Sequence, residues 1–565
     1  MRFLRPFLVL ALVLVVGGGV WLWFNQPSPV DLANYAPADS LLYVELNNPV
    51  EVAHAIEHSD VWKAAAPITH SEPSSENKFT MAAAKSGIGP IEAVLFARSQ
   101  IALVVVGVNA SEEDETLRVR PEVALIAETH TSRWRTKPAV VAAVKQLAGI
   151  AYGASNCTER SADAEYVECS VTGGERKIIG AVDGTLVVVG NTENAVRSCL
   201  EAKRGTRPTI ATDPEFVRVR SSFTSDKPLG FGYISASNSA KLFSWAAPLL
   251  MGRGPGDRQL EQLLAVSAGK ILRGVAWTAV SKDGAIEDRY HFSLEPQVVS
   301  RLQPAFETAE RDQDFWKLVP ESFESLTIYR SKEPALAWRS LDSAVAMKLD
   351  ALPAVLFGSL LKSSLSAYGI GDPKEVLTTL TPPLLTLRPS AAVEGSVLVA
   401  RVSDEARLRR SLVQEAFKAS NGQIVEGIQS ELDPELEFSA VFSDGYVLLG
   451  RTENMQPCLV ALRRSAAMND PIKKAAQESS AAILTYANDE LRLRNFILTL
   501  LMLQGRRLNA EEVANLDKSV RYYTFSSTET RLGVDGIERK TRSAFGQFST
   551  FVSLLRTERS DVVSR

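Results

Sequence analysis

A short motif that occurs twice is the strongest constraint on how this chain can fold. Residues 190–194 read Gly-Asn-Thr-Glu-Asn and residues 450–454 read Gly-Arg-Thr-Glu-Asn. Each copy follows two apolar runs separated by Asp-Gly, which is a typical turn of a β-hairpin. Each also continues into a segment with apolar residues at i, i+3 and i+4, which predicts a helix with one buried face. We therefore expect the same strand–turn–strand–helix unit to be built twice.

Other pairs of segments recur in the same order along the chain. Gly-Ile-Gly occurs at 87–89 and 369–371, and strand-like segments pair as 122–128 with 396–402 and 230–235 with 482–486. Long repeats of this kind are whole domains, because solenoid units are only about 20 to 50 residues long. Hairpins mixed with single helices predict an α+β fold with mostly antiparallel sheets. The chain is thus predicted to contain two homologous halves with packed helices.

The duplication and the ends of the chain predict a domain organisation. In order, we expect a cytoplasmic stub (1–6), a transmembrane anchor (7–24), a linker (25–36), a first α+β repeat (37–296), a helical linker (297–317), a second α+β repeat (318–546) and a C-terminal helix or tail (547–565).

The anchor is predicted from an apolar run at residues 7–24 that contains no charged side chain. As a helix, its 18 residues would be about 27 Å long, close to the hydrocarbon thickness of about 30 Å. Trp21 and Trp23 stand where a cleaved signal peptide would have small residues, which favours an uncleaved anchor. Arg2 and Arg5 predict a cytoplasmic N-terminus, and hence a single-pass inner-membrane protein with its bulk in the periplasm.

Composition narrows the classes of function. The net charge is −4 over 565 residues, which implies no attraction for nucleic acid. Five histidines leave little material for metal or acid–base sites, and four cysteines are too few for a disulfide scaffold. Cys157 and Cys169 flank a polar loop between two predicted strands. They form a disulfide in an oxidising compartment or are two separate small buried side chains, and the sequence leaves both open.

Residues 37–46 read Pro-Ala-Asp-Ser-Leu-Leu-Tyr-Val-Glu-Leu, which predicts a turn followed by a strand. With an N-terminal anchor before it and a Gly-Ile-Gly segment leading to an apolar strand after it, the chain resembles a group of uncharacterised bacterial envelope proteins that share a domain of unknown function. The resemblance implies a bacterial, extracytoplasmic protein and brings no activity or site residues with it.

One arrangement of residues suggests a mechanism. His54, Glu57 and His58 form His-x-x-Glu-His, in which two histidines on one helix face would bind Zn²⁺ and the glutamate would act as general base. The sequence marks no third ligand downstream, and Glu122 and Glu128 are the residues considered for it. The alternative is a set of surface residues on an amphipathic helix whose buried face includes Val52, Ala55, Ile56 and Trp62.

Two further motifs have simple structural interpretations. Thr192 to Asn194 and Thr452 to Asn454 are interpreted as helix caps rather than a ligand site, with Asn454 as the cap of the second helix because Pro457 is best tolerated in a first turn. Arg133, Arg135 and Lys137 surround Trp134, and this small basic patch is interpreted as a solvated surface or as a contact for lipid headgroups.

Taken together, the sequence predicts a non-enzymatic, membrane-anchored binding or scaffold protein of the bacterial cell envelope that needs no cofactor. Its expected partners are the membrane itself, through residues 7–24, and an envelope protein, a lipid or a wall component; no nucleic-acid partner is expected. The alternative is a zinc-dependent peptidase that uses His54, Glu57 and His58.

Overall fold

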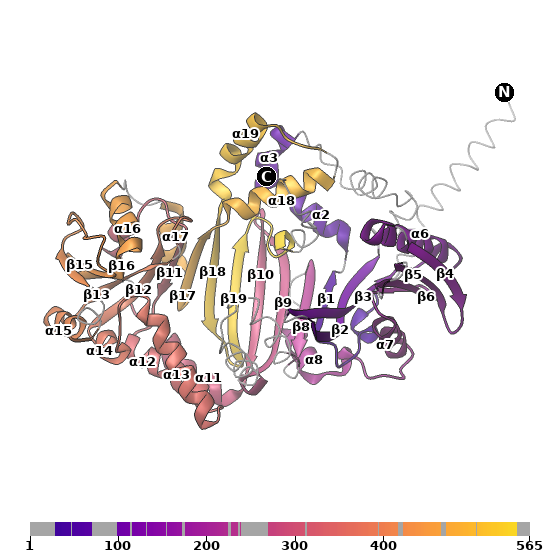
Figure 1. Ribbon diagram of the computed structural model, residues 1–565, viewed down its shortest axis with the longest axis horizontal. Coiled ribbons are helices and arrows are strands. Elements are labelled where there is room, and N and C mark those ends of the chain that lie inside the picture. Colours follow the sequence, from indigo (N-terminus) through magenta and orange to yellow (C-terminus); the bar gives the residue numbers. More distant parts are fainter. Residues whose placement is uncertain are drawn as a thin grey trace, which may run out of the picture.

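Groups of strands and groups of helices alternate along the chain. The computed structural model (Figure 1) describes residues 29–46, 48–69, 99–113, 116–131, 133–153, 155–171, 174, 176–223, 228–235, 238, 269–310, 314–393, 395–415, 422–464, 470–503 and 506–550. Within these ranges the strands form one large, mostly antiparallel sheet with helices packed against it, which confirms the predicted α+β class. The predicted anchor at 7–24 and the Gly-Ile-Gly segment at 87–89 lie outside the described residues.

The strands of the sheet fall into two consecutive groups. Those of the first half are β1 (Leu42–Leu46), β2 (Gln100–Glu113), β3 (Thr116–Glu128), β4 (Ser155–Ser161), β5 (Glu165–Val171), β6 (Lys177–Asp183), β7 (Leu186–Gly190), β8 (Gly230–Ser235), β9 (Leu272–Lys282) and β10 (Ala285–Leu294). Those of the second half are β11 (Ser325–Tyr329), β12 (Leu380–Arg388), β13 (Val397–Val402), β14 (Gln423–Glu426), β15 (Phe438–Ser443), β16 (Tyr446–Arg451), β17 (Ile483–Asn488), β18 (Phe525–Leu532) and β19 (Gly536–Ser543).

Helices connect these strands, and several of them pack against the sheet. The first half and the linker contain η1 (Leu32–Tyr35), α2 (Pro49–Glu57), α3 (Asp60–Thr69), α6 (Arg133–Tyr152), α7 (Glu193–Lys203), η2 (Ile210–Thr212), α8 (Pro214–Ser222), α11 (Pro296–Phe306) and η3 (Asp314–Leu318). The second half contains α12 (Pro334–Ala346), α13 (Ala351–Ser366), α14 (Pro373–Leu377), α15 (Glu405–Glu415), α16 (Thr452–Arg464), α17 (Asp470–Glu478), α18 (Glu490–Leu503), α19 (Ala510–Val520) and η4 (Arg521–Tyr523).

The strand pairings give the sheet a linear order. It runs β4-β5-β6-β7-β3-β2-β1-β8-β9-β10 through the first half and continues β19-β18-β17-β11-β12-β13-β16-β15-β14 through the second. Read outward from the centre, β10-β9-β8-β1-β2-β3-β7-β6 has the same connectivity as β19-β18-β17-β11-β12-β13-β16-β15. The two halves therefore repeat one strand order about the middle of the sheet.

The halves meet at a continuous seam and not through a flexible joint. Strands β10 and β19 pair antiparallel from Ile286 opposite Ser543 to Ser293 opposite Gly536. Beside this seam, α3 of the first half packs against α18 and α19 of the second through an apolar cluster that includes Trp62 and Phe496. Figure 1 shows these three helices gathered above the middle of the sheet. Strand pairing and apolar packing together make one folded body of the two halves.

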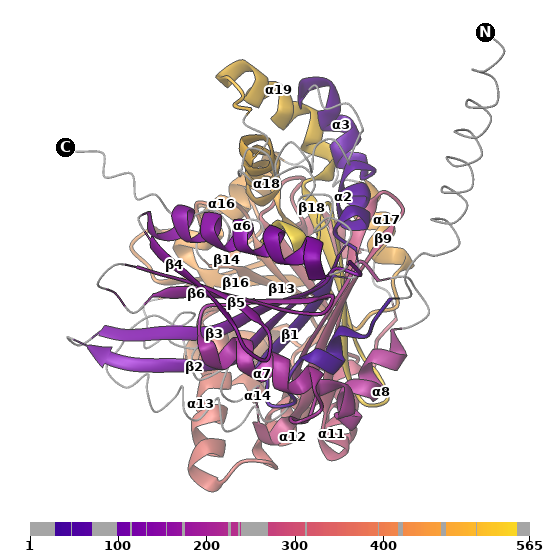
Figure 2. The same cartoon turned by 90° about the vertical axis from the view of Figure 1, so that its right-hand side faces the viewer.

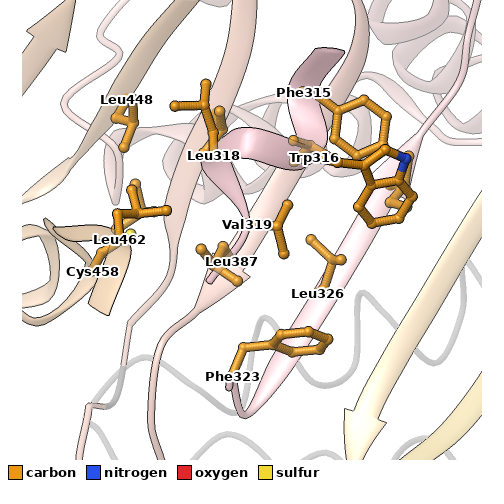
Figure 3. Packing of buried hydrophobic residues seen from close by; sticks show 14 of the residues in the cluster. Phe315, Trp316, Leu318, Val319, Phe323, Leu326, Leu387, Leu448, Cys458 and Leu462 are labelled. Atoms are coloured by element: carbon orange, nitrogen blue, oxygen red, sulfur yellow. The ribbon is translucent and has the colours of Figure 1, made fainter. Parts of the chain in front are cut away.

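The segment that links the halves is helical, and parts of it are buried. Val298 and Leu302 of α11 pack in a cluster with Ala344 of α12. Phe315 and Trp316 of η3 enter the main apolar cluster of the second half, where Figure 3 shows them beside Leu326 of β11. Burial of this segment fixes the linker against both halves.

The β2–β3 hairpin is longer than the sequence predicts. Residues 111–115 are predicted as an acidic turn, but 111–113 extend β2 and pair with the start of β3. Only Ile101 to Val105 of β2 pair with β1, and only Ala124 to Glu128 of β3 pair with β7. The outer part of the hairpin therefore extends beyond the sheet, as Figure 2 shows.

Two element boundaries also differ from prediction. The sequence predicts one helix from Pro49 to about Ala65, with the proline in its first turn, and a strand over 521–526. The helix expected over 49–65 is two helices, because the hydroxyl of Ser59 accepts a hydrogen bond from the backbone N–H of Trp62 and caps α3 separately. The strand expected over 521–526 begins at Phe525 because Arg521–Tyr523 forms a short 3-10 helix.

Candidate functional site

The His-x-x-Glu-His residues lie at the end of α2. Pro49 begins this helix, with Asn48 as its cap, and His58 ends it. The imidazole rings of His54 and His58 stack with their centroids 3.7 Å apart and their planes 20° from parallel. Nδ1 of His58 lies 2.9 Å from the backbone oxygen of His54. The lone pair of an imidazole nitrogen lies in the plane of its ring, so the lone pairs of two stacked rings lie in nearly parallel planes. A tetrahedral zinc site instead needs the lone pairs of its ligands to converge on one point.

The two glutamates considered as third ligands contact other groups. Glu122 of β3 accepts hydrogen bonds from the side chains of Asn109 and Asn194. Glu128, at the end of the same strand, is buried and accepts a hydrogen bond from the backbone N–H of His130. Across the described ranges, no group of three or more His, Cys, Asp or Glu side chains is placed to share a metal ion. Zinc binding by His54 and His58, with Glu57 as base, stays a prediction.

The repeated Thr-Glu-Asn motif caps one helix and begins the other. Thr192 is the N-cap of α7, and its hydroxyl accepts a hydrogen bond from the N–H of Ala195 at 3.2 Å. In the second half, however, α16 begins at Thr452 and Pro457 lies inside it, so the prediction that Asn454 is the cap is wrong. Thr452 is buried, with its hydroxyl 2.8 Å from that of Ser439. The sequence suggested neither this buried contact nor the tolerance of an internal proline.

A buried ionic network holds the chain where it enters the first half. Glu45 of β1 is 3% exposed and accepts hydrogen bonds from the hydroxyl of Tyr43 at 2.5 Å and from Nη2 of Arg220 at 2.8 Å. The same guanidinium donates to Asp31 at 2.6 Å and lies over the ring of Phe216. Burial raises the pKa of the Glu45 carboxyl, and the positive charge of Arg220 opposes that rise. Nothing in the strand pattern 42–46 distinguished Glu45 from a solvent-exposed residue.

The residue before Asp31 is held by a second set of hydrogen bonds. The side-chain amide of Gln100 accepts a hydrogen bond from the N–H of Val30 at 2.8 Å and donates to its carbonyl oxygen at 3.0 Å. The same amide oxygen lies 3.2 Å from Nε2 of His130, in the loop that leads into α6. The chain therefore enters the folded body beside the start of α6, where Trp134 is 70% exposed.

A groove opens near the other end of α6. It has a volume of about 420 Å³ and is lined by Arg120, Ala151, Tyr152, Val171, Gly174 and Arg176. Among the described residues of its lining, Arg120 and Arg176 carry guanidinium groups, and the ring of Tyr152 adds an aromatic wall. Guanidinium groups bind carboxylates and phosphates through paired hydrogen bonds. The groove is thus suited to an anionic group, a role that the sequence did not suggest because its residues come from separate elements.

Cys157 and Cys169 form a disulfide. They are directly opposite each other in the antiparallel pair β4–β5, so the strand register decides between the two alternatives that the sequence left open. Cys199 and Cys458 are buried thiols in the two equivalent helices α7 and α16. Burial raises the pKa of each thiol to about 12, so neither is a reactive nucleophile.

None of the helices within the described ranges is long and apolar enough to cross a bilayer, and residues 7–24 are not among those ranges.

Comparison with known proteins finds only distant structural likeness. No protein-family model matches the chain, and no curated protein matches it. Two crystal forms of TP0453 are similar to part of it. Form IV has 10% identity and a TM-score of 0.23 over 46% of this chain and 81% of that one. Form III has 11% identity and a TM-score of 0.25 over 50% of this chain and 91% of that one. Likeness this distant does not bear on function.

Proposed function

We propose that the protein is a non-enzymatic binding or scaffold protein of the bacterial cell envelope, anchored in the inner membrane by residues 7–24 with its folded part in the periplasm. The observation that carries this proposal is the union of both halves in one sheet through β10 and β19. A sheet of this extent offers a partner a long, preformed surface, and preformed surfaces bind without the cost of ordering. Two features of the sequence support the same function: the apolar run that would form the anchor, and the small number of histidines, which leaves little material for a catalytic site.

The compartment is supported by the Cys157–Cys169 disulfide, because such bonds persist in oxidising compartments and are rare in the cytosol. Residues 37–46, which carry the resemblance to uncharacterised envelope proteins, lie at the entry to the first half and supply the buried Tyr43 and Glu45.

The two halves are proposed to descend from an internal duplication. Their shared strand order supports this origin, and so do the equivalent buried cysteines Cys199 and Cys458. The halves have diverged at the edges of the sheet. The first half ends with the antiparallel strands β5 and β4, whereas the second half ends with the single short strand β14, which is parallel to β15.

The partner is proposed to be an envelope protein, a lipid or a wall component that presents an acidic group to the groove lined by Arg120 and Arg176. The test is crosslinking of the full-length protein in native membranes, followed by purification and quantification. We expect one partner at a fixed ratio with the wild-type chain and with an Arg407→Ala/Arg410→Ala control on α15. The Arg120→Ala/Arg176→Ala variant should lose most of it.

Two results would contradict this function. One is turnover of a defined substrate by the purified protein that a point substitution abolishes. The other is stoichiometric zinc in the purified protein that is lost in His54→Ala, which would favour the peptidase alternative.

A further inference from the structure

The first turn of α6 lies beside the point where the chain enters the folded body. Gln100 binds the backbone of Val30 and also contacts His130, three residues before Arg133. Five residues lie between Phe24, the last residue of the apolar run, and Val30. Even fully extended, the six Cα–Cα steps from Phe24 to Val30 span only about 20 Å. If residues 7–24 span the membrane, the first turn of α6 is therefore held close to the bilayer surface.

The side chains of this turn have the chemistry of a membrane-interface contact. Trp134 is 70% exposed, and the guanidinium of Arg135 lies 4.6 Å from the centre of its ring. Tryptophan is enriched at the level of lipid headgroups, where its apolar ring and its N–H both find suitable surroundings. An exposed tryptophan with a cation on its ring thus matches that environment better than bulk water.

The charge of the same turn is positive. Arg133 and Lys137 both donate hydrogen bonds to Glu165, while Arg135 adds a further positive charge. Arg133, Arg135, Lys137 and Glu165 together carry a net charge of +2. The N-terminus of a helix of 20 residues adds a partial positive charge. Basic residues near a membrane are attracted to anionic lipids.

The equivalent helix of the second half lacks these features. Helix α15 follows β13 as α6 follows β3, and its first turn reads Glu-Ala-Arg-Leu with no aromatic residue. Figure 1 shows the two helices at opposite ends of the sheet. The exposed tryptophan is therefore not a requirement of the repeated fold, and α15 provides a matched control.

We propose that Arg133, Trp134, Arg135 and Lys137, the α6 tip, form a docking surface for anionic lipid headgroups that orients the folded body on the membrane. This inference rests on the proposed anchor at residues 7–24. Helix α6 is about 30 Å long, and the arginine groove lies near its far end. Docking of the α6 tip therefore fixes which end of the first half faces the bilayer.

The test uses the full-length protein reconstituted in vesicles whose acyl chains carry bromine, which quenches tryptophan fluorescence on contact. The quenching of Trp134 is measured as the difference in quenched fluorescence between the wild-type chain and Trp134→Phe. We expect this difference to be present with anionic phosphatidylglycerol and reduced severalfold in neutral vesicles or high salt. Arg135→Glu should weaken docking by about fivefold for each unit of charge changed. Arg410→Glu on α15 should leave it unchanged.

The outcomes separate this inference from the anchor. Trp21 and Trp23 lie in the apolar run, so quenching that persists in Trp134→Phe reports the anchor alone. If Trp134→Phe and the wild-type chain are quenched equally, the anchor stands and the docking surface is refuted. If neither is quenched, the anchor fails and the inference fails with it. A Trp338→Phe variant in the second half controls for loss of a tryptophan as such.

Discussion

The buried carboxylate of Asp288 accepts a hydrogen bond at 3.0 Å from the backbone N–H of Gln547, which lies 259 residues further along the chain. Its other oxygen accepts a hydrogen bond from Nε1 of Trp277 at 2.8 Å, and Phe548 packs edge-on against that indole. The end of the second half is therefore attached to the first half through an acid that is 1% exposed. No cation is among the hydrogen-bond partners of this carboxylate in the described structure.

This attachment predicts a pH dependence of stability. Burial raises the pKa of Asp288 to about 6, although the hydrogen bonds from Trp277 and Gln547 oppose the rise. An unfolded aspartate has a pKa of about 3.9, so between these values the folded state binds more protons and the contribution of Asp288 to stability falls as pH rises. The loss is about 3 kcal/mol between about pH 4 and about pH 7.

Urea denaturation of the wild-type chain and Asp288→Asn across this pH range measures the effect. Other groups titrate in both proteins, so the difference between their unfolding free energies isolates Asp288. We expect Asp288→Asn to be less stable at the acidic end and to gain on the wild-type chain as pH rises. A difference that does not change with pH would contradict the prediction.

The Arg220 network predicts a second large effect. Arg220→Ala removes the cation hydrogen-bonded to the carboxylate of Glu45, which is buried. Leaving one partner of a buried pair uncompensated costs about 3–5 kcal/mol of unfolding free energy. Because the substitution raises the pKa of Glu45 further, the loss should be smaller at acidic pH, where this carboxyl is neutral.

Chemical denaturation at neutral and acidic pH measures both parts of this prediction. The exposed pair Lys474 and Glu478 serves as the control, because separating an exposed ion pair costs less than about 1 kcal/mol. An Arg220→Ala variant no less stable than Lys474→Ala would argue against a buried ionic network.

The disulfide should stabilise the first half. A disulfide that closes a loop of this length lowers the conformational entropy of the unfolded chain, which stabilises the folded state by about 3 kcal/mol. The double variant Cys157→Ser/Cys169→Ser should therefore have an unfolding free energy lower by about that amount. A reducing agent should destabilise the wild-type chain to the same extent and leave the double variant unaffected. Equal stability of the oxidised and reduced wild-type protein would contradict this.

The sequence predicted local structure well and long-range structure poorly. Apolar periodicity placed β5, β6, β7 and the buried faces of α7 and α16, because those signals lie within a few residues of one another. The seam between β10 and β19 joins residues about 250 positions apart, and no local pattern encodes which strands pair. The prediction of a cap at Asn454 failed where Thr452 is buried against Ser439. The prediction of a single helix over 49–65 failed because it overlooked a local signal, the cap that Ser59 provides for α3.

The arginine groove and the buried Glu45 were missed for a related reason. Arg120, Tyr152 and Arg176 come from β3, the end of α6 and the loop before β6, and only the fold brings them together. Glu45 alternates with apolar residues in β1, as a solvent-facing residue would, yet it shares the buried side of the strand with Tyr43 and pairs there with Arg220.

The seam predicts how the halves respond to cleavage. Glu307 and Glu310 are exposed between α11 and η3, so a protease site inserted there should be cut. Because eight residue pairs of β10 and β19 and the α3–α18–α19 cluster still join the halves, the fragments should co-elute in native size-exclusion chromatography and separate only in denaturant. Separate elution under native conditions would show that the seam is weak.

The repeated motif itself predicts an unequal response to the same substitution. A Cβ added at Gly190 would lie 2.8 Å from Cγ2 of Val196 and 3.0 Å from the carbonyl oxygen of Val123, whereas at Gly450 the nearest atom is the carbonyl oxygen of Ser396 at 3.4 Å. Overpacking of a core typically costs about 1–3 kcal/mol, so Gly190→Ala should lower the unfolding free energy by that amount and Gly450→Ala by much less. Each substitution is the control for the other in thermal or urea unfolding. Equal losses would mean that the glycine is needed for the hairpin-to-helix connection in both halves, and not for the close approach of Val196 in the first.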